Sequence, residues 1–205
     1  MLANDVYWLT HDDWSGEPFT SERVAGVMVA AAVLADLVEA GAVGVINGEV
    51  VVTLPPPKPL DSLSVKVTRQ ISGEEKRYPV EKWLEFLGTD MCRRVAERMV
   101  ADGLARVEKV GWRRQSAVVA AERDLRAAWV RAGLAKDLAD GSRLTDEQYF
   151  LLRLAQHSSV SKQVFTDVPP EVMERAYAEA AYELPHLQDL LDAAVNTILA
   201  AALTH

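Results

Sequence analysis

This chain of 205 residues has one cysteine and no long uncharged apolar run. Each of these two absences excludes a class of protein. The lone Cys92 excludes an intramolecular disulfide and fits a reducing compartment. The most apolar late stretch, residues 190–203, carries Asp192 and Asn196 and is too short to span a bilayer. The first residues are acidic where a secretory signal would be basic. We therefore expect a cytoplasmic protein that contacts a membrane only peripherally.

Motifs of catalysis and of metal binding are also lacking. The four histidines have no HExxH or other close metal-ligand spacing, and neither a GxSxG elbow nor a GxxxxGK[ST] loop occurs. His11, Asp12 and Asp13 could form a metal or acid–base cluster of a hydrolase, but a solvated turn is the favoured interpretation. We expect no catalysis, no cofactor and no metal.

Basic residues are scarce overall and concentrated in the middle of the chain. The net charge is −8, yet residues 62–114 hold twelve basic and eight acidic residues, a net charge of about +4. An acidic chain is a poor non-specific binder of nucleic acid, so no nucleic-acid partner is expected. The basic segment, in contrast, could meet an anionic surface.

One sequence pattern, called the repeated phrase below, occurs twice, in residues 31–47 and 93–109. Each copy is an amphipathic helix, a glycine (Gly41 or Gly103) and then alternating apolar residues that predict a strand. Asn47-Gly48 predicts a hairpin turn, and a second hairpin with Gly111 near its tip is expected after the second copy. The predicted fold class is mainly α-helical with two small β-hairpins. We expect a single domain over 1–205, with repeat-like units at about 20–54 and 80–120 and a proline-rich linker at 55–59.

The remaining helices follow from caps and apolar periodicity. Thr145 and Gln148 form a capping-box pattern, and prolines stand at permitted helix starts. The predicted helices are 21–40, 80–88, 90–102, 121–139, one after Thr145, 161–166, 170–184 and 185–203.

The helix–glycine–hairpin phrase is typical of a winged-helix unit, which serves in both regulators and interaction domains. The second copy carries Arg93, Arg94 and Arg98, with Arg113 and Arg114 at the hairpin. Because Arg94 and Arg98 are four residues apart, they share a helix face, and this patch is the best anion-binding candidate. Ordinary surface arginines near Glu97 and Asp90 are the alternative.

Several phrases, taken in order, resemble the Golgi phosphoprotein three family. They are AVLADLVEAGAV at 32–43, EKWLEFLG at 81–88, VAERMVADGLA at 95–105, LAQHSSVSKQVF at 154–165 and the closing AVNTILAAALTH. Eukaryotic members of that family are peripheral Golgi proteins that bind phosphatidylinositol 4-phosphate. The resemblance implies a compact domain around a buried helical bundle, a compact bacterial-type homologue, and a hairpin that serves self-association, here near Trp112.

The family's phosphate-binding positions, transferred through these phrases, are substituted in this chain. The aromatic position falls at Ser21, the first arginine at Ala30, and the other two basic positions at Thr89 and Cys92. Arg93, Arg94 and Arg23 lie close by in the sequence and are the candidate ligands for an anionic phospholipid head group such as a phosphoinositide. The resemblance implies a non-catalytic peripheral membrane or adaptor protein with weak or altered lipid binding. The alternative is a winged-helix-type protein-interaction or regulatory domain without lipid binding. Protein clients are expected partners under both interpretations.

Overall fold

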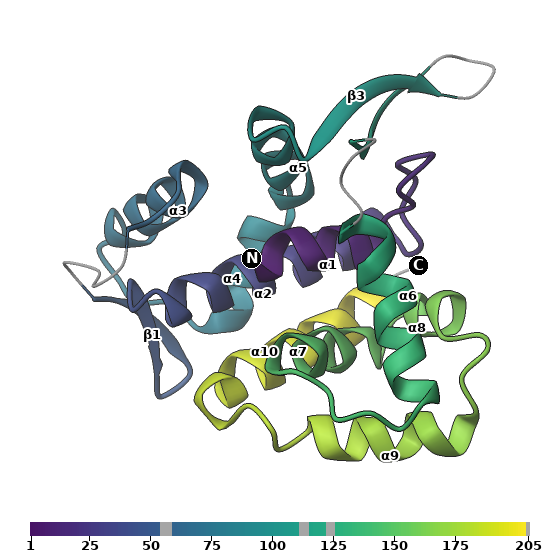
Figure 1. Ribbon diagram of the computed structural model, residues 1–205. Helices are drawn as coiled ribbons and strands as arrows, with labels where there is room; N and C mark the ends of the chain where they lie inside the picture. Colours follow the sequence, from purple (N-terminus) through teal and green to yellow (C-terminus); the bar gives the residue numbers. More distant parts are fainter. Residues whose placement is uncertain (54–58, 111–114, 122–125, 204–205) are drawn as a thin grey trace.

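The computed structural model describes residues 1–53, 59–110, 115–121 and 126–203, and helix predominates in them (Figure 1). The prediction of a mainly helical fold with two small hairpins is confirmed. The helices are α1 (Leu2–Thr10), α2 (Glu22–Glu39), α3 (Ser62–Ser72), α4 (Val80–Gly88), α5 (Met91–Ala101), α6 (Arg126–Ala139), α7 (Asp146–Ala155), α8 (Ser159–Val164), α9 (Pro170–Ala180), the 3₁₀ helix η1 (Pro185–Leu187) and α10 (Gln188–Ala202). The strands are β1 (Val43–Ile46), β2 (Glu49–Val52), β3 (Ala105–Val110) and β4 (Gln115–Ala120).

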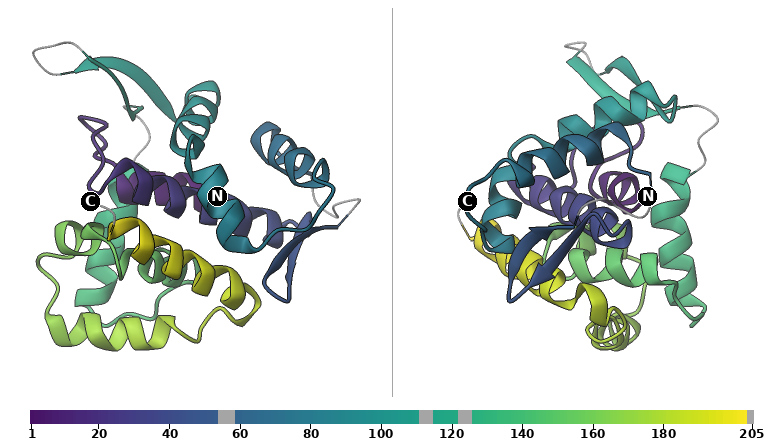
Figure 2. Two further views of the ribbon diagram at one scale, coloured as in Figure 1. Left: turned by 180° about the vertical axis from the view of Figure 1, so that it is seen from behind. Right: turned by 90° about the vertical axis from the view of Figure 1, so that its left-hand side faces the viewer.

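Helix α2 is the central element of the core. It is apolar on nearly every side, and α1, α4, α5 and α10 pack against it (Figure 2). A helix that is hydrophobic all round must be enclosed by others to be stable in water. Buried apolar side chains from Leu2 in α1 to Ala201 in α10 form one hydrophobic cluster around it.

The crossing of α2 and α4 depends on two glycines. A Cβ atom added to Gly26 would lie 2.0 Å from the carbonyl oxygen of Gly88. Any side chain at position 26 would therefore push the two helices apart. Gly88 is the last residue of α4, and it also borders the cavity described below.

The two copies of the repeated phrase end their helices in the same way. In the first, Gly41 N donates to Val38 O and Ala42 N donates to Leu37 O, both at 2.9 Å. In the second, the corresponding bonds leave Gly103 N and Leu104 N at 3.1 and 2.8 Å. Both glycines have positive φ, 70° and 73°, so each copy ends in a Schellman motif. The predicted stops at Gly41 and Gly103 are confirmed.

Each phrase continues into an antiparallel hairpin, as predicted. In the first hairpin Ile46 pairs with Glu49, and the turn residues Asn47 and Gly48 both have positive φ (53° and 75°). This is the type I′ arrangement that Asn-Gly favours. The second hairpin pairs Ala105 with Ala120 through Val110 with Gln115, and it projects from the helical body (Figure 1). Its expected tip, with Gly111, Trp112, Arg113 and Arg114, lies outside the described residues, as does most of the 55–59 linker.

Helix α3 was not among the predicted elements. Its sequence alternates apolar and polar residues at its start, a pattern that suggests a strand more than a helix. The residues it buries, Leu63, Val67 and Ile71, are instead spaced by four. Asp61 begins this helix, because its carboxylate accepts hydrogen bonds from the backbone amides of Leu63 and Ser64 at 2.9 and 3.3 Å.

The C-terminal half follows the prediction with shifted boundaries. The capping box is present, since Thr145 Oγ1 accepts from Gln148 N and Gln148 Oε1 accepts from Thr145 N. Helix α8 begins two residues before the predicted 161, and α9 ends at Ala180 rather than at 184. The start predicted near 121 for α6 falls partly among residues that are not described, and its described part begins at Arg126.

Candidate functional site

A cavity of about 750 Å³ lies beside the second hairpin, and we call it the hairpin cavity. One part of its lining comes from Tyr7 of α1, His11 directly after α1, loop residues Gly16 and Pro18, and Glu22 at the start of α2. The end of α4 and one face of α5 line another, with Gly88, Thr89, Asp90, Cys92, Arg93, Ala96, Glu97 and Val100. The hairpin contributes Val107, Ser116, Ala117 and Val118. Residues from α1, the loop after it, α2, α4, α5 and the second hairpin thus meet at this site.

Two stacked aromatic rings belong to the α1 part of the cavity. The rings of Tyr7 and His11 are 4.1 Å apart and nearly parallel, because residues four apart share a helix face. His11 Nδ1 lies 3.0 Å from the carbonyl oxygen of Tyr7 and 2.9 Å from Thr10 Oγ1. Burial lowers the pKa of His11 to about 4, although the bond to the Tyr7 carbonyl opposes this shift. The imidazole is therefore neutral at pH 7.

Cys92 of α5 lines the cavity, and its thiol is unreactive at neutral pH. Burial, together with the nearby carboxylate of Glu22, raises the pKa of its thiol to about 12. A thiol that stays protonated at pH 7 is a poor nucleophile and a poor metal ligand.

Arg93 is the basic side chain among the described residues that line the cavity. Its Nη1 donates to Glu97 Oε1 at 2.6 Å, and its Nη2 donates to Asp90 Oδ2 at 3.0 Å. The two acidic partners lie one turn to either side of Arg93, three residues before it and four residues after it. The guanidinium charge is therefore already compensated by two carboxylates that line the same cavity.

The other two candidate ligands do not line the cavity. Arg94 is half-buried, with its Nη1 3.7 Å from Asp90 Oδ1. Arg23 is exposed in the first turn of α2. The predicted trio of Arg93, Arg94 and Arg23 thus does not converge on one described pocket.

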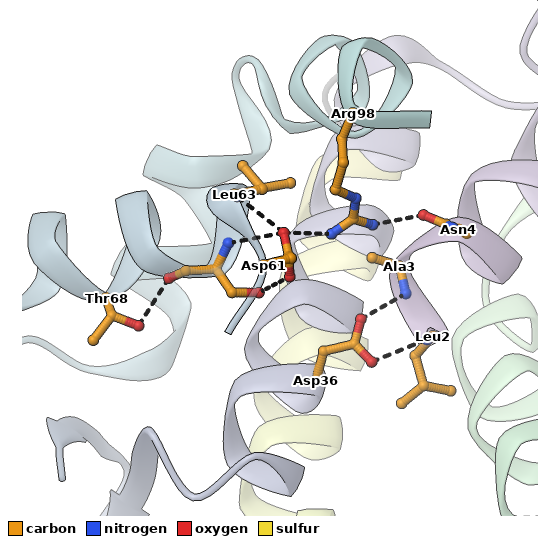
Figure 3. Close-up of polar contacts among 9 residues, drawn as sticks. Leu2, Ala3, Asn4, Asp36, Asp61, Leu63, Thr68 and Arg98 are labelled. Atoms are coloured by element: carbon orange, nitrogen blue, oxygen red, sulfur yellow. Dashed lines mark hydrogen bonds and ion pairs between the residues drawn. The ribbon is translucent and has the colours of Figure 1, made fainter. Parts of the chain in front are cut away.

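Arg98 was predicted to share an anion-binding face with Arg94, and this was wrong. Its side chain is buried, and it donates from Nη2 to Asn4 Oδ1 at 2.5 Å and from Nη1 to Asp61 Oδ1 at 3.3 Å (Figure 3). Asp36 lies close by and accepts from the amides of Leu2 and Ala3 at 3.0 and 3.1 Å. Arg98 therefore joins α5 to α1 and to the start of α3, and it offers no free charge to a ligand.

The four positions to which the resemblance assigned phosphate binding lie near the hairpin cavity, with one exception. Thr89 and Cys92 line it, and Ser21 precedes the lining residue Glu22. Ser21 caps α2 by accepting from Val24 N at 3.3 Å, and the Thr89 hydroxyl donates to Phe86 O at 2.8 Å. Ala30 is fully buried within α2. These positions carry local structural roles and no positive charge.

The possible hydrolase cluster does not assemble. His11 faces the cavity region, whereas Asp12 accepts from the amides of Trp14 and Ser15 at 3.1 and 2.7 Å. Asp13 forms an ion pair with Arg131 of α6. Within the described residues no three His, Cys, Asp or Glu side chains group as metal ligands. The favoured interpretation of these residues as a turn agrees with these bonds.

Sequence reasoning did not identify Tyr7 and Glu22 as residues of the site. The four-residue spacing of Tyr7 and His11 was a usable signal, because it predicts a shared helix face. No comparable signal existed for Glu22, whose place beside Cys92 depends on how α2 and α5 pack. In the described part of the chain, no helix is both long and apolar enough to cross a bilayer.

The fold and the site together define the class of the protein, an α-helical domain with two hairpins and an open cavity beside the second. The family model described as Golgi phosphoprotein 3 (GPP34) matches residues 2–202. The chain therefore belongs to this family, and the resemblance inferred from its phrases is confirmed. A comparison with curated proteins gave no match.

Proposed function

We propose that this chain is a non-catalytic adaptor of the Golgi phosphoprotein 3 family that holds phosphoinositide head groups weakly or not at all. It works in the cytoplasm and touches membranes only peripherally. The observation that supports this most is the pairing of Arg93 with Asp90 and Glu97 at 3.0 and 2.6 Å. A phosphate would have to compete with both carboxylates for this guanidinium.

The charge of the cavity opposes an anionic ligand as well. Its described lining holds three carboxylates, those of Glu22, Asp90 and Glu97, against the single guanidinium of Arg93, a net charge of −2. Unit charges of one sign at 4 Å repel by about 4 kcal/mol near a protein surface. The chain as a whole, at −8, adds no attraction to an anionic membrane.

The substituted positions remove the usual means of holding a phosphate. Charge-assisted hydrogen bonds contribute about 1.5–3 kcal/mol each, and every 1.4 kcal/mol is a factor of ten in affinity. Thr89 and Cys92 line the cavity without a charge. The absence of two such contacts weakens phosphate binding by roughly a hundredfold or more.

Liposome co-sedimentation tests the proposal directly. Neutral vesicles with and without about 5 mol% phosphatidylinositol 4-phosphate are compared at low salt, where electrostatic binding is strongest. We expect the protein to remain in the supernatant in both cases. Salt-sensitive binding to the phosphoinositide vesicles that Arg93→Glu with Arg94→Glu abolishes would overturn the proposal.

A variant with restored charge supplies the matched positive control. Thr89→Arg with Cys92→Arg places two guanidinium groups on the cavity wall where the family has basic residues. We expect this variant to gain phosphoinositide-dependent sedimentation. If the variant is folded and still does not bind, the charge deficit is not what limits the wild type.

The projecting hairpin favours a second role in protein contact. Strands β3 and β4 extend from the helical body (Figure 1). Val107 on β3 is 59% exposed. Exposed apolar side chains on an antiparallel ribbon suit a protein client or a second copy of the chain. Light scattering of wild type and Val107→Lys across a concentration series tests self-association. A mass that stays monomeric at high concentration would remove this role.

A further inference from the structure

The end of α1 and the start of α2 bring hydrogen-bond acceptors to the hairpin cavity. His11 Nδ1 is 3.0 Å from the carbonyl oxygen of Tyr7, and a carbonyl can only accept. The Nδ1 atom therefore carries the proton, and Nε2 of the neutral ring is left with a lone pair. Glu22 adds a carboxylate to the same lining, and no ion-pair partner of Glu22 exists among the described residues.

The hydroxyl of Tyr7 is an unpartnered polar group in the same lining. The Tyr7 residue is only 4% exposed, and within the described chain its hydroxyl makes no hydrogen bond. The hydroxyl oxygen is not one of the fully buried side-chain atoms that lack a partner, so it stays accessible to water or to a ligand in the cavity. Burial also raises the pKa of Tyr7, so the group is a neutral phenol that can accept from a bound donor.

Apolar side chains make up much of the remaining lining. They include Ala96 and Val100 of α5 and Val107 and Val118 of the second hairpin. Small-molecule sites commonly pair such a lining with a few placed polar groups. A ligand that fits this lining has a cationic donor at one end and a hydrocarbon chain at the other.

We propose that the hairpin cavity binds an alkylammonium ion, with Glu22, His11 and Tyr7 receiving the ammonium group and α5 and the second hairpin enclosing the alkyl chain. An ammonium carries three donors and no acceptor, which matches the acceptors present. Its charge is opposite to the net −2 of the described lining. The inference deepens the proposed function and rests on its statement that this cavity does not hold phosphate.

A matched ligand series tests the charge requirement. Octylammonium, octanol and octanoate share one chain and differ in the head group, and each is titrated calorimetrically into the full chain at pH 7. We expect saturable binding of octylammonium at one site, at least tenfold weaker binding of octanol, and no binding of octanoate. Equal affinity for octylammonium and octanol, or no saturable binding of octylammonium, would overturn the inference.

Two substitutions locate the head group. Glu22→Gln removes the charge with little change in shape, and Tyr7→Phe removes the hydroxyl while keeping the stacked ring. We expect octylammonium binding to weaken at least tenfold in the first and about threefold to tenfold in the second. Glu171→Gln is the control, because Glu171 is exposed in the first turn of α9 and does not line the cavity. Unchanged affinity in both Glu22→Gln and Tyr7→Phe would contradict the proposed site.

The same head group could be free in solution or displayed on a membrane, and vesicles with stearylamine separate these sources. Because the chain is acidic, it will associate with such vesicles nonspecifically, so Glu22→Gln is compared with Glu171→Gln at equal net charge. If only Glu22→Gln loses binding to the stearylamine vesicles, the ligand is an amine displayed on a membrane. If octylammonium binds but Glu22→Gln binds the vesicles as well as Glu171→Gln does, the ligand is an amine free in solution. If neither octylammonium nor the stearylamine vesicles bind in a way that depends on Glu22, this inference is overturned and the proposed function still stands. The proposed function is overturned by a different result, the binding of the protein to phosphoinositide vesicles.

Discussion

Arg98 of α5 donates to Asp61, the residue that begins α3, across 3.3 Å from Nη1 to Oδ1. The same guanidinium donates to Asn4 of α1, so one buried side chain connects three helices that are far apart in sequence (Figure 3). The carboxylate of Asp61 also caps α3. This connection holds α3 against the body, and it removes Arg98 from any ligand-binding role.

Replacing Arg98 should destabilise the whole domain. Arg98→Met keeps an apolar stem but leaves Asn4 and the carboxylate of Asp61 without their partner. We expect the free energy of unfolding to fall by about 2–3 kcal/mol, measured by urea denaturation at pH 7. Arg93→Met is the control, since its ion pairs are exposed and should contribute little. Equal effects of the two substitutions would contradict the structural role of Arg98.

The contribution of Asp61 should depend on pH. Burial alone would raise its pKa, but the Ser64 hydroxyl, Arg98 and the amides of Ser64 and Leu63 together hold the pKa below its ordinary value. A carboxyl with a depressed folded-state pKa stabilises the protein above its unfolded pKa of about 3.9, and loses that effect as pH falls through the folded value. The stability difference between wild type and Asp61→Asn should therefore be largest near pH 7 and shrink below about pH 4. A difference that is constant from pH 7 to pH 3 would contradict this.

Two glycines in helices should respond in opposite directions to alanine. At Gly26 the added methyl would lie 2.0 Å from the Gly88 carbonyl oxygen, so we expect Gly26→Ala to destabilise by at least about 2–3 kcal/mol. At Gly133 the nearest atom, on the Trp129 ring, would lie 3.5 Å away. Gly133→Ala should therefore stabilise by up to about 1 kcal/mol through helix propensity. Thermal melts of the two variants check this ordering, and a stable Gly26→Ala would contradict the close helix crossing.

His11 should make the domain sensitive to mild acid. Its folded-state pKa of about 4 lies below the ordinary 6.5, so the unfolded chain binds a proton more readily. Stability from this group is complete above about pH 6.5 and falls as pH drops toward 4, by on the order of 3 kcal/mol. His11→Gln should lose this slope, as followed by urea denaturation between pH 7.5 and 4. The two slopes would coincide if His11 were solvated and unperturbed.

Much of the fold could be predicted because its signals are local. Gly41 and Gly103 end helices at positions that require positive φ, and both residues of the Asn47-Gly48 turn also require positive φ. Thr145 and Gln148 form a reciprocal helix cap. Each of these depends on a few adjacent residues. Helix α3 was missed because its alternating start contradicts its true period, and its identity depends on Asp61 and on burial against the body.

The site was less predictable because it is a product of packing. The sequence identified Arg93 and the substituted positions Thr89 and Cys92, and these line the hairpin cavity together. The alternative interpretation of ordinary surface arginines near Asp90 and Glu97 agrees with the ion pairs of Arg93. No local signal showed that Arg98 turns inward to Asn4 and Asp61. A helix-face argument places two residues side by side, but which face is buried depends on elements far away in the chain.

The central claim is that the hairpin cavity does not hold an anionic head group despite its place in this family. Calorimetric titration of soluble inositol 1,4-bisphosphate into wild type and into Thr89→Arg with Cys92→Arg, at about 50 mM salt, tests it most directly. We predict no saturable binding to wild type and saturable binding to the variant. Micromolar binding to wild type that Arg93→Glu abolishes would contradict the account.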